Sequence, residues 1–175
     1  READLLADRI TVIDQGIGLQ TAAPQTLFQK PRNSRVAELV GISNMFHGIF
    51  NSGSLTWDGC QHIFSVADKG KIPPNMRVAW VIPQNGLSVH TNPSDISVCA
   101  TVEKVSSLGQ IAVIQFRIEN SSNTIEWEAS AAEVKRLQIE VGKLMYIELD
   151  GNQIHIMPLR PINDPRRFQE STIPN

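Results

Sequence analysis

The sequence contains few cysteines. Cys60 and Cys99 are the only two in 175 residues, and neither has a histidine or another cysteine at the spacing of metal ligands. This distribution gives no disulfide framework and no Cys/His metal site, so we predict that both side chains act as small buried hydrophobic groups.

Long apolar runs and strong net charge are also missing. No stretch approaches the roughly twenty apolar residues of a membrane-spanning helix, and no basic-then-apolar segment marks a secretory leader. The formal net charge is −2, which gives no general attraction to nucleic acid or to an anionic membrane surface. With 41% hydrophobic residues, the chain can build an ordinary core. We expect a cytoplasmic protein with no nucleic-acid partner.

Side chains that often carry catalysis are scattered. The histidines, which show no paired spacing, are His47, His62, His90 and His155. Glu126 and Glu128 are two positions apart on one predicted strand, so they lie on the same face of it. No acid–base partner accompanies them in the sequence. We predict a solvated face there, no catalytic residue and no metal site.

From Asn44 onward, short β-type segments alternate with turn residues, a pattern typical of a small all-β barrel. The predicted strands span 45–50, 54–58, 61–66, 77–82, 86–90, 97–106, 110–118, 124–130, 143–149 and 152–157. The turn clusters interpreted as hairpin signals are 51–53, 58–59, 84–86 and 150–152. One helix is predicted over 131–137. Gly109 is predicted to adopt a positive φ between two strands. The tryptophans Trp57, Trp80 and Trp127 are predicted to be core residues.

The first part of the chain has a different pattern. β-branched residues predict a buried strand over 10–13, and a glycine turn over 16–18 leads to a second strand. Two helices follow, one beginning at Pro24 and the other capped by Asn33 or Ser34. This order of elements favours a unit separate from the β-rich region.

Three ordered blocks in this part carry a family resemblance. They cover 2–16, which contains L-A-D-R-I-x-V, then 24–31 and 36–41. Together they resemble the segment that follows the switch histidine in ATP-binding subunits of ABC importers. The resemblance implies an α/β remnant of the ATPase domain over 1–42, with all phosphate-contacting motifs located before Arg1. We therefore expect no cofactor and no ATP hydrolysis in this fragment, and ATP and Mg in the full-length parent.

The β-rich region resembles the regulatory domain that follows the ATPase domain in such importers, an oligomer-binding-fold module called the TOBE domain. The matching segments are 44–48 (N-x-F-x-G), 100–109 and 141–146 together with 155–158. The implied fold is mainly β, an oligomer-binding-fold-like small barrel of TOBE/MOI type over 43–158. We predict that 159–175 is a poorly ordered tail.

One departure from the family pattern concerns the connection between the two lobes of this domain. Ile82 and Gln84 stand where many members have an arginine and a glutamate that tie the lobes together. The usual polar network between the lobes is therefore in doubt.

The resemblance implies a regulatory and dimer-contact function, coupled in the full-length protein to ATP-driven solute uptake. The implied partners are a second copy of the chain and, through the full-length ATPase domain, transmembrane permease subunits at the inner face of the membrane. Two alternatives stay open. The barrel could sense an oxyanion such as molybdate or sulfate and inhibit ATP turnover, or it could dock a regulatory protein.

For an oxyanion, the candidate ligands are hydroxyl groups. Ser130 lies at the start of the predicted helix 131–137 and could offer its hydroxyl and unpaired amides, with Ser106 and Ser107 as partners. The alternative, which the sequence favours, is that Ser130 is an ordinary helix cap. The segment after Met145 lacks the lysine of molybdate-binding modules of this type, which disfavours the oxyanion alternative.

Overall fold

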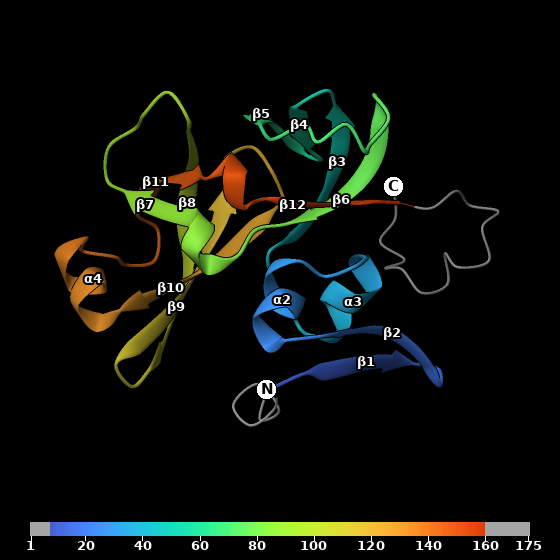
Figure 1. The fold of residues 1–175 in the computed structure, drawn as a ribbon. Coiled ribbons are helices and arrows are strands. Elements are labelled where there is room, and N and C mark those ends of the chain that lie inside the picture. Colours follow the sequence, from blue (N-terminus) through green and yellow to red (C-terminus); the bar gives the residue numbers. More distant parts are fainter. Residues whose placement is uncertain (1–7, 160–175) are drawn as a thin grey trace.

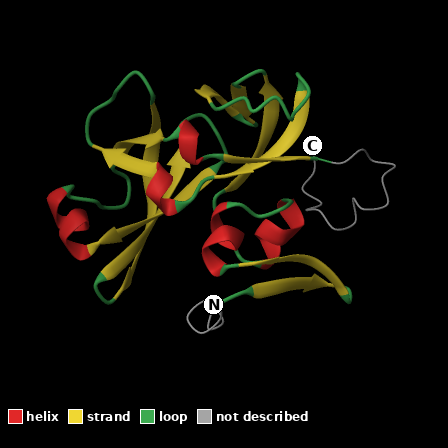
Figure 2. Cartoon of the chain, in the orientation of Figure 1, coloured by secondary structure: helices red, strands yellow, loops and turns green. Residues whose placement is uncertain are grey.

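The computed structural model describes residues 8–159 and consists mainly of β-strands (Figures 1 and 2). The tail predicted for 159–175 lies outside the described residues, apart from Leu159. The β-rich region forms two five-stranded antiparallel sheets. The prediction of a mainly β, oligomer-binding-fold-like domain with an α/β segment before it is confirmed, although the sheets are open at their edges.

The sheets are defined by their strand orders. The first sheet has the order β12 (His155–Pro158), β6 (Met76–Val81), β3 (Met45–Asn51), β4 (Ser54–Trp57) and β5 (Cys60–Ser65). The second sheet has the order β10 (Thr124–Ser130), β9 (Ile111–Ile118), β8 (Ser97–Leu108), β11 (Leu144–Leu149) and β7 (Leu87–His90). The chain therefore changes sheet twice, after β6 and after β11.

Both changes of sheet run through a short 3₁₀ helix. The helix η1 (Gln84–Gly86) links β6 to β7, and η2 (Gly151–Gln153) links β11 to β12. The hairpins predicted at 84–86 and 150–152 are therefore wrong, because the strands on either side belong to different sheets and do not pair. The Asp150 backbone N–H donates to the Gly86 carbonyl at 2.9 Å. The two crossovers consequently lie side by side.

The other predicted turns do close hairpins. The clusters 51–53 and 58–59 join paired strands, β3 with β4 and β4 with β5. The β8–β9 hairpin closes through Gly109 and Gln110, since the last residue of β8 pairs with the first of β9. Gly109 has a φ of 71° and Gln110 has no positive φ, the pattern of a type II′ turn. The predicted positive φ of Gly109 is confirmed.

We expect Gly109→Val to lower the free energy of unfolding by more than about 1 kcal/mol. A Cβ at this position would meet no atom within 4 Å, so the loss would come from forcing a β-branched residue to the φ of +71°. Urea unfolding measures the change. Gly109→Asn is the matched control and should lose less, because asparagine tolerates a positive φ. A valine variant as stable as the wild type would contradict the assignment.

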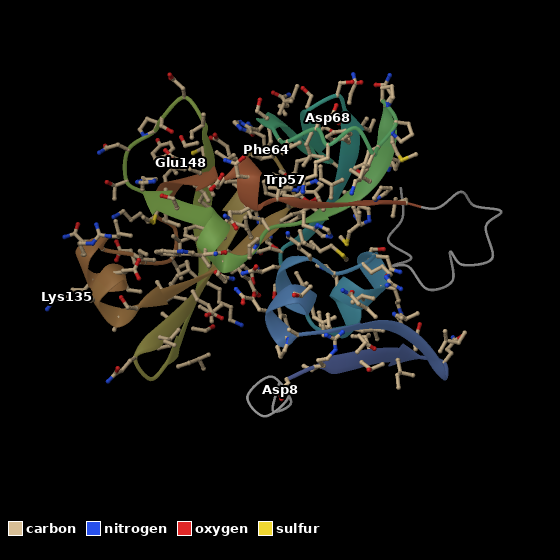
Figure 3. The ribbon with its side chains drawn as sticks, viewed as in Figure 1. Asp8, Trp57, Phe64, Asp68, Lys135 and Glu148 are labelled. Atoms are coloured by element: carbon tan, nitrogen blue, oxygen red, sulfur yellow. The ribbon has the colours of Figure 1, made fainter. Side chains whose placement is uncertain are left out.

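The main core lies between the two sheets and is rich in aromatic side chains. Trp57 and Trp80 are each at most 1% exposed, and their ring centroids are 5.4 Å apart. Phe46 lies 4.5 Å from Trp57, and Phe64, labelled beside Trp57 in Figure 3, lies 6.1 Å from it. Trp127 of β10 is also buried. The prediction that all three tryptophans are core residues is confirmed.

The segment before the β-rich region has its own small core. It contains β1 (Ile10–Asp14), β2 (Ile17–Ala22), α2 (Pro24–Gln29) and α3 (Ser34–Leu39), as the sequence predicted. Asn33 is the cap of α3, since its Oδ1 accepts from the Val36 N–H at 2.9 Å. The buried apolar side chains of this unit are Val12, Leu19, Ala22, Leu27 and Val36. We call residues 8–42 the N-terminal segment.

The N-terminal segment packs on the first sheet (Figure 1). Ala37 of α3 belongs to one buried cluster with Ala79, Val81 and Met157. In addition, His155 Nε2 donates to the Pro31 carbonyl at 2.8 Å. The N-terminal segment is therefore attached to β6 and β12 by both apolar packing and a hydrogen bond.

Candidate functional site

Ser130 is the N-cap of α4 (Ala131–Arg136). Its hydroxyl accepts from the Glu133 backbone N–H at 3.1 Å, while Glu133 Oε1 accepts from the Ser130 backbone N–H at 3.2 Å. This reciprocal pair is a capping box. The Ser130 hydroxyl and amide that the sequence offered to an anion are therefore already partnered within the helix cap.

Ser106 and Ser107 lie on β8, separated from Ser130 by a strand. They pair with Val113 and Ala112 of β9, and β10 pairs with the other edge of β9. Two strand spacings amount to roughly 10 Å. Successive residues of a strand also point to opposite faces, so the structure does not bring the three hydroxyls together. Anion binding by these serines stays a prediction.

The clearest polar arrangement joins the two sheets. Asn44 Nδ2 donates to the Glu126 carbonyl, and Asn44 Oδ1 accepts from the Glu126 N–H, both at 2.8 Å. Gln84 repeats this arrangement: its Nε2 donates to the Glu126 carbonyl at 3.2 Å and its Oε1 accepts from the Glu128 N–H at 2.9 Å. Among residues 8–159, no strand pairs with the outer edge of β10, and amide side chains bond to its backbone there instead.

A third amide extends this connection. Asn123 Nδ2 donates to the Asp58 carbonyl at 2.6 Å, and we call Asn44, Gln84 and Asn123 the inter-sheet amides. The missing charges at positions 82 and 84 suggested that the usual polar network between the lobes is lost. The structure shows that Gln84, a neutral residue, still connects the two sheets through hydrogen bonds to β10. Sequence reasoning missed the roles of Asn44 and Asn123. The only signal was the place of Asn44 in the N-x-F-x-G motif.

Three histidines have pKa values below the ordinary range. Burial is the main cause for His47 and His62, and the positive charge of Arg77 adds to it at His47. Burial also lowers the pKa of His155, with Lys30 and Lys69 acting in the same direction and the hydrogen bond to Pro31 acting against them. In all three, the folded protein favours the neutral ring over the protonated one.

We expect stability to fall as the pH is lowered from about 7 to about 5. These histidines have folded pKa values below the unfolded value of about 6.5. The unfolded chain therefore takes up protons first, and the stability present above the unfolded pKa is lost as the pH falls through the folded pKa. Urea midpoints across this range measure the slope. His155→Gln should reduce it, and an unchanged slope would contradict a contribution from His155.

Two open cavities surround the outer end of β11. One, of about 600 Å³, lies between β7 and α4, and the other, of about 520 Å³, lies between β5 and the β7–β8 loop. Glu148 lines both cavities. Its carboxylate accepts from the Ser94 hydroxyl at 2.8 Å and lies 3.7 Å from His90 Nε2.

Within residues 8–159, no three His, Cys, Asp or Glu side chains are grouped as metal ligands. Cys60 and Cys99 are free thiols and only half-buried, so the prediction that both are buried holds only in part.

An exposed apolar pair marks the end of the β8–β9 hairpin. Leu108 is 67% exposed and Ile111 is 50% exposed, and the two pair across the strands. The end of this hairpin points away from the rest of the molecule in Figure 1. Val141 and Leu144, beside β8, are exposed as well. We call Leu108 and Ile111 the hairpin pair.

No protein-family model matches the chain. Its curated relatives include the sulfate/thiosulfate import ATP-binding protein CysA of Bacillus cereus, 26% identical over 148 residues that cover 84% of this chain and 41% of the relative. CysA 2 of Shewanella oneidensis is 29% identical, with 84% and 41% covered. The spermidine/putrescine import ATP-binding protein PotA of Clostridium novyi is 26% identical, with 89% and 42% covered. The chain thus spans well under half the length of these relatives.

A solved structure gives a likeness in fold. The crystal structure of the cytoplasmic molybdate-binding protein ModG with molybdate bound has a TM-score of 0.58 and 11% sequence identity, covering 67% of this chain and 96% of that chain. In the described residues, no helix is long and apolar enough to cross a membrane. The resemblance predicted from the motifs is confirmed: the chain is similar to the C-terminal part of ATP-binding subunits of ABC importers, with an oligomer-binding-fold-like region.

Proposed function

We propose that this chain is the regulatory and dimer-contact region of an ATP-binding subunit of an ABC importer. In this proposal, residues 1–42 are the end of the ATPase domain and 43–158 form the regulatory domain. The intact subunit contacts a second copy through the regulatory domain and the permease subunits through its ATPase domain, at the inner face of the membrane. It couples ATP hydrolysis to solute uptake.

The hairpin pair is the observation that supports subunit contact. These two large aliphatic side chains lie at the projecting end of a hairpin and are not buried in the core between the sheets. Burying them against another protein surface would lower the free energy of association. A second copy presents the same pair, and twofold contacts are the commonest closed arrangement of identical chains. We therefore place the contact at this hairpin.

We expect Leu108→Glu combined with Ile111→Glu to weaken self-association at least about tenfold, because charged side chains would have to be desolvated in the contact. Sedimentation velocity from low to high micromolar concentration measures it. Ile63→Glu is the matched control: Ile63 is 60% exposed but lies on β5 of the first sheet. A wild-type chain that stays monomeric throughout, or a control as impaired as the double variant, would overturn the assignment.

The two alternative functions receive less support. The likeness to ModG is one of fold, and the candidate serines are separated by a strand, with Ser130 used as a helix cap. We therefore do not extend the function to oxyanion sensing. Docking of a regulatory protein would compete with the second copy for the hairpin pair if it used the same surface.

A further inference from the structure

A third cavity lies where the loop after β5 meets β12. Its volume is about 420 Å³, within the range of small-molecule sites. Its apolar lining comes from Phe50, Val66, Ile72, Ile154 and Ile156. Phe50 is buried, and the other four are half-buried residues at the margin of the main core. The cavity therefore offers a preformed apolar floor beside solvent.

The rim of this cavity is cationic. Lys69 and Lys71 line it, and neither forms a hydrogen bond or ion pair within residues 8–159. Asp68 is the carboxylate of the lining, and its Oδ1 accepts from the Gly70 N–H at 2.9 Å. Lys30 lies close enough to lower the pKa of His155, which also lines the cavity. The rim therefore carries an excess of unpaired positive charge.

The cavity also adjoins the junction between the N-terminal segment and the first sheet. His155 belongs to its lining and donates the hydrogen bond to the Pro31 carbonyl. A molecule in the cavity would therefore lie beside the polar contact that joins these two parts of the chain.

We propose that this cavity binds a small amphipathic carboxylate, with its apolar body on the isoleucine-lined floor and its carboxylate at Lys69 and Lys71. The apolar floor and the cationic rim together favour a ligand with an apolar body and a negative charge. A small inorganic anion would leave the floor exposed to water, and an apolar cation would be repelled by the lysines of the rim. The inference goes beyond the proposed function, since subunit contact needs no ligand.

The charge of residues 160–175 also disfavours this segment of the chain as the occupant of the cavity. Pro158 lines the cavity, and residues 160–175 follow in the sequence after Leu159. They contain three arginines against one aspartate and one glutamate. An excess of positive side chains does not complement a rim formed by Lys69 and Lys71, so an external anion is the better match.

Titration of the full chain with octanoate, followed by amide chemical shifts in NMR, tests the proposal. We expect saturable shifts confined to residues 66–72 and 151–158, and none with octylammonium, which has the same apolar chain and the opposite charge. Lys69→Glu combined with Lys71→Glu should weaken octanoate binding about tenfold. Lys135→Glu is the matched control, because Lys135 lies on α4, well away from Asp68 in Figure 3.

Four results would overturn the proposal, the first three of which concern the strength of binding. These three are shifts that do not saturate, equal binding of octylammonium, and double-variant binding as tight as that of the Lys135→Glu control. Shifts centred on the hairpin pair would likewise place the ligand elsewhere. None of these readouts depends on self-association, so the failure of one proposal is distinguishable from the failure of the other.

Discussion

Alanine at position 48 is expected to destabilise the protein by about 3 kcal/mol or more, the upper part of the range for overpacking. Gly48 lies in β3, in the N-x-F-x-G motif, and the neighbouring antiparallel strand β4 approaches it closely. A Cβ on Gly48 would lie 1.8 Å from the Thr56 carbonyl oxygen and 2.7 Å from its carbonyl carbon. These are backbone atoms of a paired strand, so they cannot rotate away as a flexible side chain would. The strands themselves would have to separate.

Urea unfolding of Gly48→Ala measures this effect, and a second strand glycine provides the control. Gly18 in β2 has no positive φ, and a Cβ added there would have Thr11 Cγ2 as its nearest contact, at 3.9 Å. Gly18→Ala should therefore change stability by no more than about 0.5 kcal/mol. If Gly48→Ala matched Gly18→Ala, the close approach of β4 to β3 would be wrong.

Asn44→Leu is expected to cost about 3 kcal/mol, because it removes two hydrogen bonds from a buried site. Asn44 is 3% exposed. After the substitution the Glu126 carbonyl keeps its bond from Gln84, but the Glu126 N–H loses its partner. An unsatisfied buried donor is the costly outcome, and it would lie at the junction of the two sheets.

A double-mutant cycle with Gln84→Leu separates the contributions of the two amides. Gln84 bonds at a more exposed position, so its single substitution should cost less, about 1 kcal/mol. Because both amides donate to the Glu126 carbonyl, removing both should cost more than the sum of the single changes. Strictly additive losses would argue against a shared network, and a stable Asn44→Leu variant would argue against any role of Asn44 in joining the sheets.

Local features of the fold could be predicted from the sequence. Alternating β-branched residues and turn clusters located the strands to within a few residues, and the positive φ of Gly109 followed from a glycine between two strands. The clusters 84–86 and 150–152 were misassigned for a physical reason. A turn cluster indicates that the chain changes direction, but it does not indicate whether the next strand joins the same sheet.

Long-range features could not be predicted in this way. Asn44 bonds to a residue 82 positions later, so its role depends on how the sheets pack. The same holds for the cavity, where Lys69 approaches His155 only because β12 returns to the first sheet. Conversely, Ser130 and Ser106 looked suitable as a pair, yet β9 separates them. Sequence spacing alone carries no information on these distances.

The late position of β12 has a consequence for synthesis of the chain. β6 is covered on one side by β3 and on the other by β12, and His155 bonds to a carbonyl 124 positions earlier. While the ribosome is still adding residues beyond β6, that strand has an open edge and Pro31 has no partner from β12. Pairings of such long separation form slowly, and open edges invite intermolecular pairing. The nascent chain is therefore most vulnerable to aggregation just before β12 emerges, and a chaperone would be most useful at that stage.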